Sequence, residues 1–423
     1  MTSLSNIELT RFLFAIVLLL AFSSVFGYLF KRFLMPRVTG EIFGGILLGP
    51  TLLGYFFPQA YTWLFNAFTT EGKLISALYW LGLVLLMFIS GFEIEKSLVK
   101  KDIKLIAFIL FGGTLIPFII GVNVLKVYNM APYIGTANNL LAFLLIIGAA
   151  LAVTSIPVIS KIFIDLKMQN TRFAKIVIAT ATIEDVLLWI AISIATGVVS
   201  THGYMIGSIV WTVFITVMFF LAALLLMPRL FSFVTKLRIN YLLKSSALGY
   251  VLFVCFFFSA LASILNINVI FGAFLAGIIS GSLGDNDDLE DIKMHIKEVS
   301  LAFFIPIYFS VVGLRLDLIH HFSFRFFLFF LLFASAIKLI GTFIGARSAG
   351  SDRLSSFNFA VAMNARGGPG IVIATVAFDL GIISETFFVT LIMLAITTSL
   401  LTGFWFSVVK SKGWQLLSPS RTG

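Results

Sequence analysis

The sequence predicts an all-α polytopic membrane protein with thirteen transmembrane helices, inverted repeats and two discontinuous helices. Hydrophobic residues make up 60% of the 423 residues, the mean hydropathy is +1.08, and only 11% are charged. A soluble domain carries about a quarter charged residues. Apolar runs of about twenty residues recur from end to end, and each can cross a hydrocarbon core of roughly 30 Å. The runs are continuous rather than alternating, which favours helices over a membrane barrel.

Each apolar run is expected to form one transmembrane helix. The polar residues 266–268 separate the eighth run from the ninth. The predicted helices are 9–30, 38–57, 73–92, 103–125, 139–164, 172–198, 206–227, 244–264, 268–283, 298–313, 324–347, 355–379 and 384–410.

The basic residues predict the orientation of these helices. Most of the 29 lysine and arginine residues lie in the loops after the odd-numbered helices and in the C-terminal tail. The alternate loops carry few of them. We expect a protein of the cell (inner) membrane. The positive-inside rule places its N-terminus outside and its C-terminus in the cytoplasm.

Composition also excludes several classes of protein. The net charge of +10 is spread over short loops, so no nucleic-acid partner is expected. Cys255 is the one cysteine, which excludes an internal disulfide and a cysteine metal cage. About a dozen residues follow the last predicted helix, and no glycine-rich nucleotide motif occurs. We therefore expect no soluble C-terminal domain and no cofactor.

Four ionisable side chains fall near the middle of predicted helices. Glu184 and Asp185 lie in 172–198, Lys338 lies in the eleventh helix and Arg366 in the twelfth. Each costs at least a few kcal/mol at that depth unless it is paired or hydrated. Adjacent acids point about 100° apart on a helix, so one base cannot easily neutralise both. We expect one acid to pair with Lys338 or Arg366 and the other to face water or a cation. The alternative is that all four only fix helix packing.

Two predicted helices are interrupted at matching places. Pro157 breaks the run AVTSIPVISK in the fifth helix. The twelfth helix contains a cluster of breaking residues, namely Gly367, Gly368, Pro369 and Gly370. Each break lies in the middle helix of a triplet, which is the pattern of inverted repeats around a binding site at the membrane midplane.

Polar residues beside the breaks have two possible roles. Thr154 and Ser155 precede Pro157, and their hydroxyls can cap the freed backbone or help to coordinate a cation. Arg366 precedes the glycine cluster, where its positive charge can offset the carbonyl ends of a half-helix. Capping and anchoring are the interpretations that we favour for these residues.

Seven motifs follow one another along nearly the whole chain, and the ordered series is more specific than any single motif. The motifs are PRVTGEIFGGILLGPTLLG at 36–54, LGLVLLMFISGFEIE at 81–95, VTSIPVISKIF at 153–163, ATIEDVLLW at 181–189, FFIPIYFSVVGLRLDL at 303–318, AIKLIGTFIGAR at 336–347 and NARGGPGIVIA at 364–374. The series resembles the monovalent cation:proton antiporter-2 family, which includes the Kef-type and bacterial sodium–proton exchangers.

The resemblance implies the sodium–proton antiporter fold, a homodimer, and elevator-like exchange of Na⁺ or K⁺ for H⁺. Asp185 matches the aspartate that binds the ion, and Glu184 takes the variable position beside it. Lys338 matches a lysine that pairs with the first acid in electrogenic members. Kef-type members often add a cytoplasmic nucleotide-binding domain, which is not expected here.

The resemblance also implies two groups of helices. The core, ion-binding helices are expected at about 73–198 and 298–410, and the panel or dimerisation helices at about 9–57 and 206–283.

These observations predict a secondary transporter rather than an enzyme. An alkali cation prefers oxygen ligands, and one buried carboxylate at Asp185 can hold a cation or a proton in turn. The alternatives are a Kef-like cation channel, which would conduct without a pH gradient, and a sodium-coupled organic solute symporter, which would take up a solute. An intramembrane aspartyl protease ranks last, since its two carboxylates would face each other from separate helices.

Overall fold

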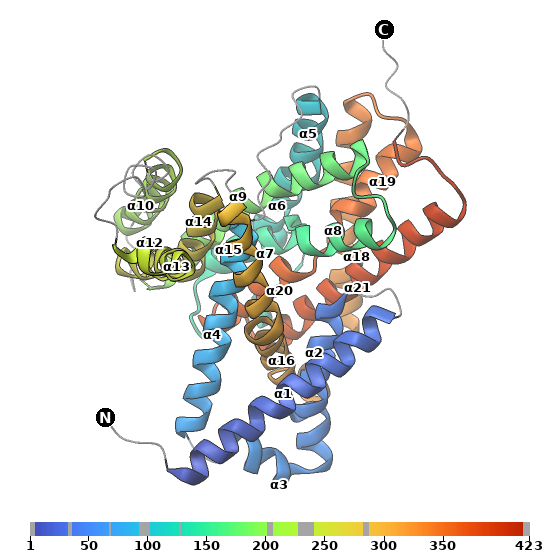
Figure 1. Ribbon diagram of the computed structural model, residues 1–423. Coiled ribbons are helices and arrows are strands. Elements are labelled where there is room, and N and C mark those ends of the chain that lie inside the picture. Colours follow the sequence, from blue (N-terminus) through green and yellow to red (C-terminus); the bar gives the residue numbers. More distant parts are fainter. Residues whose placement is uncertain are drawn as a thin grey trace. The chain divides into compact units, whose positions relative to one another are not determined.

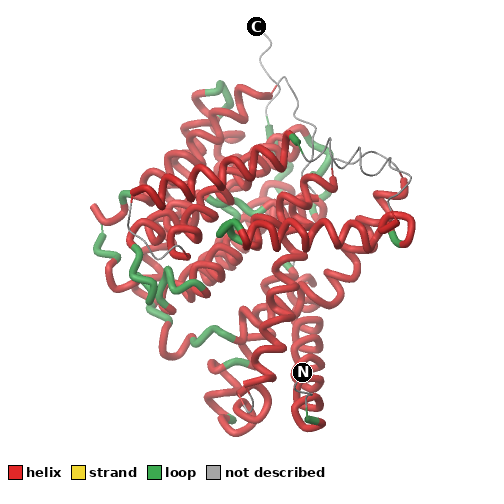
Figure 2. Tube along the Cα trace, turned by 90° about the vertical axis from the view of Figure 1, so that its left-hand side faces the viewer, coloured by secondary structure: helices red, strands yellow, loops and turns green. Residues whose placement is uncertain are grey.

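The computed structural model is helical along the chain, and short loops join the helices (Figures 1 and 2). It describes residues 5–32, 36–66, 69–92, 102–126, 128–200, 206–226, 241–281 and 287–417. Within these residues the β-structure is an isolated antiparallel bridge between Ile134 and Ile383. The helical class predicted from the continuous apolar runs is therefore confirmed.

The chain divides into two compact units. The first unit comprises residues 1–31, 37–94 and 200–319. Its longer helices are α1 (Asn6–Arg32), α2 (Arg37–Leu48), α4 (Thr69–Phe92), α10 (Ile206–Leu225), α13 (Ala247–Ile264), α14 (Val269–Gly281), α15 (Asp287–Val299) and α16 (Ile305–Leu314).

The second unit comprises residues 32–36, 95–199 and 320–423. Its first group of helical segments is α5 (Ile103–Leu110), η4 (Phe111–Leu115), α6 (Ile116–Val122), α7 (Leu140–Ala152), α8 (Ile156–Asp165) and α9 (Arg172–Ser200). Its second group is α18 (Phe324–Ser348), α19 (Arg353–Met363), α20 (Gly368–Asp379) and α21 (Glu385–Ser411). These groups correspond to the two triplets of predicted helices that contain the breaks.

Ten helices in the described part of the chain are long and apolar enough to cross a membrane. Two shorter apolar helices, Val210–Ala223 and Val269–Gly281, cover the seventh and ninth predicted segments. The second predicted segment corresponds to α2 and the π-helical turn Pro50–Gly54. The multi-pass architecture is confirmed, while the count of thirteen membrane crossings stays a prediction.

Glycines allow the helices of the first unit to pack closely. A Cβ atom added to Gly91 of α4 would lie 3.0 Å from the Cα atom of Gly277 in α14. A Cβ atom added to Gly277 would lie 2.9 Å from the Cα atom of Gly91. Lipid tails are as apolar as the side chains of a membrane helix, so the hydrophobic effect does not drive helices together. Small residues such as these glycines allow the close backbone packing that does.

The grouping of helices by contact differs from the predicted core and panel at two places. Residues 73–92 and 298–313 were assigned to the ion-binding core on the resemblance. In the structure α4 and α16, which contain most of these residues, belong to the first unit. The second unit contains only the two triplets among its membrane helices in the described residues. Which helices move during transport remains a prediction.

Candidate functional site

Both predicted breaks are present, and each divides one membrane span into two half-helices. The first break is the extended segment Val153–Ser155 between α7 and α8. The second lies between Met363, the last residue of α19, and Gly368, the first residue of α20. Pro157 and Pro369 lie in the first turns of α8 and α20. The N–H groups of a first turn have no acceptor within the helix, so proline costs no helix hydrogen bond there. The prolines therefore begin the second half-helices instead of kinking continuous ones.

The two breaks contact each other directly. The backbone N–H of Ser155 donates to the carbonyl oxygen of Ala365 at 2.6 Å. The Thr154 hydroxyl donates to the carbonyl oxygen of Met363 at 2.7 Å. The Ser155 hydroxyl oxygen accepts from the N–H of Val158 at 3.4 Å and caps α8. These contacts use both hydroxyls to satisfy freed backbone groups, as the capping interpretation predicted.

Gly367 is the glycine of the second break that this crossing requires. A Cβ atom at Gly367 would lie 3.0 Å from the Ser155 hydroxyl oxygen and would overlap the Val158 side chain. A Cβ atom at Gly370 would have its nearest neighbours at 3.6 Å, and one at Gly368 would have none within 4 Å. The close approach of the two breaks therefore depends on a bare backbone at residue 367.

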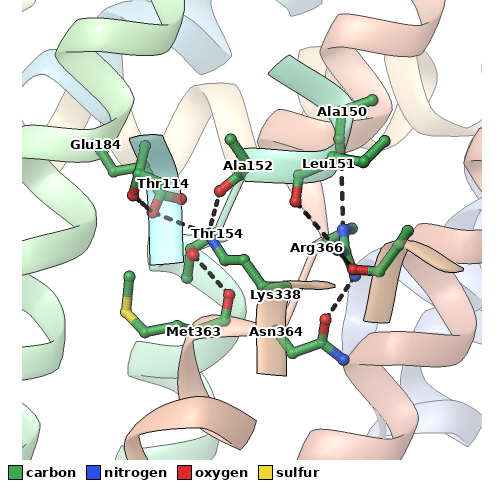
Figure 3. Close-up of polar contacts among 11 residues, drawn as sticks. Thr114, Ala150, Leu151, Ala152, Thr154, Glu184, Lys338, Met363, Asn364 and Arg366 are labelled. Carbon is green, nitrogen blue, oxygen red and sulfur yellow. Dashed lines mark hydrogen bonds and ion pairs between the residues drawn. The ribbon is translucent and has the colours of Figure 1, made fainter. Parts of the chain in front are cut away.

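Arg366 binds the carbonyl end of the half-helix α7 (Figure 3). Its Nε donates to Ala150 O at 3.2 Å, and its Nη2 donates to Leu151 O at 3.2 Å. Nη2 also donates to Ala334 O at 2.8 Å, and Nη1 donates to the Asn364 side-chain oxygen at 2.6 Å. The last carbonyls of a helix lack intrahelical donors and carry partial negative charge. The predicted anchoring role of Arg366 agrees with this geometry.

Lys338 bridges the same helix end to Glu184. Its ammonium nitrogen donates to the carbonyl oxygen of Ala152 and forms an ion pair with Glu184 Oε2 at 2.9 Å. Both side chains of the pair are completely buried. The Thr114 hydroxyl donates to the same Glu184 oxygen at 2.5 Å (Figure 3). The structure thus pairs Glu184 with Lys338, a choice that the sequence left open between Lys338 and Arg366.

Asp185 has a different environment from its neighbour Glu184. Its side chain is buried, and its Oδ1 atom has no hydrogen-bond partner among the described residues. Its carboxylate forms no ion pair with that part of the chain either. A buried carboxylate oxygen without a donor is costly when charged, so this group calls for a proton or a cation. Among the described residues, Glu184 and Lys338 pair with each other and Arg366 is held by carbonyl and amide oxygens, whereas Asp185 has no ion pair and no donor on Oδ1.

Two contributors to the site were not predicted from the sequence. Thr114 lies in the apolar run 103–125, where a single hydroxyl does not stand out, although the preceding glycines in FGGTL mark a close helix approach. Asn364 is part of the NARGGPG motif, but nothing local shows that its side chain accepts from Arg366. The backbone carbonyls of residues 150–152 have no sequence signal beyond the nearby break.

Residues 17–412 match the family model for the transmembrane part of sodium/hydrogen exchangers. The match covers nearly the whole chain, including both breaks and all four buried charges. The chain belongs to the sodium/hydrogen exchanger family. The resemblance first inferred from the motifs is therefore confirmed.

Several curated relatives of this exchanger family member are named as antiporters. The Na⁺/H⁺ antiporter NhaS4 of Synechocystis is 28% identical over 401 residues, with 92% of this chain and 94% of the relative covered. The Na⁺/H⁺-K⁺ antiporter GerN of Bacillus cereus is 26% identical, with 93% and 94% covered. K⁺/H⁺ antiporter 1 of Saccharomyces cerevisiae is 27% identical over 94% of this chain but 46% of its own length.

A solved structure has the same fold as this family member. It is the sodium proton antiporter MjNhaP1 from Methanocaldococcus jannaschii, with a TM-score of 0.69 and 17% sequence identity. The similarity covers 96% of this chain and 99% of the other. The sodium–proton antiporter fold predicted from the sequence is therefore confirmed.

Proposed function

We propose that this protein exchanges a monovalent cation, Na⁺ or K⁺, for protons across a membrane, and that Asp185 is the shared binding site. The observation that carries the proposal is the contrast between two adjacent buried acids. Glu184 Oε2 is bound by Lys338 and Thr114, and its Oε1 has no partner, whereas Asp185 has neither an ion pair nor a donor on its buried Oδ1 in the described residues. The names of the curated relatives, which are Na⁺/H⁺ and K⁺/H⁺ antiporters, support the same reaction.

Competition for one carboxylate is enough to couple the two fluxes. An alkali cation takes oxygen ligands, which Asp185 supplies together with backbone carbonyls, water and the hydroxyl oxygens of Thr154 and Ser155. A proton on Asp185 removes the charge that the cation needs. The bare carboxylate would cross the apolar core poorly, because nothing neutralises it there. Exchange follows when only the proton-loaded and cation-loaded forms cross.

The Glu184–Lys338 pair sets the number of protons moved. If Lys338 releases its proton when the cation arrives, two protons move for each cation and transport is electrogenic. If Lys338 stays charged and paired, one proton moves and transport is electroneutral. Measuring whether a membrane potential drives exchange distinguishes the two stoichiometries.

The crossed half-helices form the frame that carries Asp185 between the two sides. Arg366 and Lys338 hold the carbonyl end of α7, so charge and dipole are balanced before any cation binds. We propose an elevator-like movement of the helices that bear the site against panel helices in a homodimer. We also place the protein in the cell (inner) membrane, with the N-terminus outside and the C-terminus in the cytoplasm.

Exchange in proteoliposomes with a trapped pH dye tests the proposal. Addition of Na⁺ or K⁺ to wild-type vesicles should move protons in the opposite direction, whereas Asp185→Asn should abolish this movement. The amide is nearly isosteric with the carboxylate, and it can neither bind a proton at these pH values nor attract a cation. Exchange at the wild-type rate by the Asp185→Asn protein would remove Asp185 from the mechanism.

A matched carboxylate-to-amide change controls for effects of the substitution itself. Asp379 is the last residue of α20, at the end opposite to the helix break, and Asp379→Asn should retain exchange. Cation current without a pH change would favour a channel, and cation-coupled uptake of an organic solute would favour a symporter.

A further inference from the structure

Thr114 donates its hydrogen bond to a side-chain carboxylate, whereas several buried threonines of the second unit donate to a backbone carbonyl of their own helix. Thr180, Thr390 and Thr398 each donate to the carbonyl oxygen four residues earlier in their own helices, at 2.8–2.9 Å. This local bond is the usual one for a helical threonine. Thr114 instead donates to Glu184 Oε2, 70 residues away in the chain, at 2.5 Å.

The local backbone explains why Thr114 points toward Glu184. Thr114 lies in η4, a π-helical turn between α5 and α6. Such a turn inserts one residue into a helix, re-aims the side chains around it, and is frequent at functional sites. The turn is unusual within this long apolar span because it also contains two consecutive glycines.

These two glycines allow η4 to pack closely against α18, the helix that contains Lys338. A Cβ atom at Gly112 would lie 2.9 Å from the carbonyl carbon of Gly341. A Cβ atom at Gly113 would lie 2.5 Å from the Thr342 hydroxyl oxygen. The close approach brings the Thr114 hydroxyl and the Lys338 ammonium onto one carboxylate oxygen.

The other surroundings of Thr114 are apolar. The residue is 4% exposed and lines a cavity of about 540 Å³ whose other lining side chains are all hydrocarbon in character. The cavity offers the hydroxyl no competing side-chain acceptor, so Glu184 is its partner. Valine has the shape of threonine and suits these neighbours, so Thr114→Val removes the hydrogen bond with little change in packing.

We propose that Thr114 is a positioning residue for cation–proton exchange: its hydroxyl holds Glu184 against Lys338 and so leaves Asp185 as the acid that is open to the cation. This inference rests on the proposed function. Without the Thr114 donor, Glu184 would keep one strong partner and could turn toward Asp185 or the approaching cation. The residue acts through Glu184 and need not touch the transported ion.

Three charged groups lie around Glu184. They are Lys338 of α18, Asp185 of the same helix, and Arg366 of the second break. The Thr114 hydroxyl and the Lys338 ammonium bind the same Glu184 oxygen, so loss of the hydroxyl leaves Glu184 held by Lys338 alone. Thr114→Val should therefore loosen the Glu184–Lys338 pair. A Lys338 that is less firmly held by Glu184 would repel a cation at Asp185 more strongly, so the apparent KM for the cation should rise several-fold.

The test compares apparent KM values and maximal rates for Na⁺ and K⁺ in proteoliposomes at one fixed pH. Thr114→Val should raise the apparent KM several-fold, with a smaller effect on the maximal rate. Thr114→Ser, which keeps the hydroxyl, should restore the wild-type KM. Thr390→Val is the matched control, since it removes a buried hydroxyl that binds only its own helix, and its KM should be unchanged.

A double variant tests whether Thr114 acts through Glu184. In a Glu184→Gln background, Thr114→Val should cause no further rise in the apparent KM, because the carboxylate that Thr114 holds against Lys338 is gone. An additional rise of the same size would overturn the proposal. So would a Thr114→Val protein with the wild-type KM, or one in which only the maximal rate falls.

Asp185→Asn, measured in parallel, separates this inference from the proposed function. Loss of exchange in Asp185→Asn together with a wild-type KM in Thr114→Val would refute the role of Thr114 alone. Persistent exchange in Asp185→Asn would refute the proposed function, and the role of Thr114 would fall with it.

Discussion

Removing Lys338 should destabilise the protein strongly, because it leaves two buried groups without their partner. Lys338 and Glu184 are both completely buried, and their nitrogen and oxygen atoms lie 2.9 Å apart. Lys338 also supplies the donor for the Ala152 carbonyl at the end of α7. Breaking a buried ion pair by removing one partner costs about 3–5 kcal/mol. For a unit of about 200 residues this corresponds to a fall in Tm of roughly 10 °C.

The assay is thermal unfolding of the detergent-solubilised protein at one fixed scan rate, followed by tryptophan fluorescence. Lys338→Gln should show the large fall in apparent Tm. The double variant Lys338→Gln with Glu184→Gln should recover more than half of the loss, since two amides need no charge compensation. Thr114 still has an acceptor in the double variant, which favours the recovery.

Two results would refute this reasoning. A Lys338→Gln protein with the wild-type Tm would mean that the pair is hydrated or not formed. A double variant as unstable as the single variant would mean that the loss comes from packing or from the Ala152 carbonyl rather than from an unpaired carboxylate. Glu184→Gln alone gives the remaining corner of the cycle and measures the coupling between the two side chains.

Two further predictions concern the crossing of the breaks and the predicted cytoplasmic end of the second unit. Gly367→Ala should reduce exchange and cost about 1–3 kcal/mol, because its Cβ would overlap the Val158 side chain and lie 3.0 Å from the Ser155 hydroxyl oxygen. Gly370→Ala has room and should stay within a few-fold of wild type in the vesicle assay. Arg172→Gln should lower the Tm, since Arg172 Nε donates to both oxygens of the buried Asp102 at 3.1 and 3.3 Å, and an unpaired buried acceptor costs about 1–3 kcal/mol. Arg172→Gln combined with Asp102→Asn should be more stable than Arg172→Gln alone, and equal or lower stability of the pair would contradict the assignment.

The positions of the broken helices could be predicted because the cause of a break is local. Pro157 and Pro369 lack the N–H group that would continue a helix from the preceding turn, and the glycines from Gly367 to Gly370 weaken a helix there. The sequence did not show that the prolines begin new half-helices. That depends on extended backbone at residues 153–155, which the contact with the other break stabilises.

The assignment of helices to core and panel stays a prediction, because contacts do not show which helices move. The resemblance implies that 73–92 belongs to the ion-binding core, and in the structure α4 packs with α14 in the first unit through Gly91 and Gly277. Glycines in a membrane helix show that a backbone approaches closely, but not which neighbour approaches. Hydropathy cannot distinguish the neighbours either, because all of the helices are similarly apolar.

The sequence by itself determined that this is a membrane protein, where its helices break, and which four ionisable residues lie within the membrane. Those properties depend on composition and on the covalent limits of single residues. Only the tertiary structure decided that Lys338 forms an ion pair with Glu184, that Arg366 donates to the carbonyl end of α7, and that Thr114 donates to Glu184. These contacts join residues 70 to 216 positions apart, so they depend on which helices meet and at what height. Among the residues that the structure describes, Asp185 is thereby left as the buried membrane acid without an ion pair.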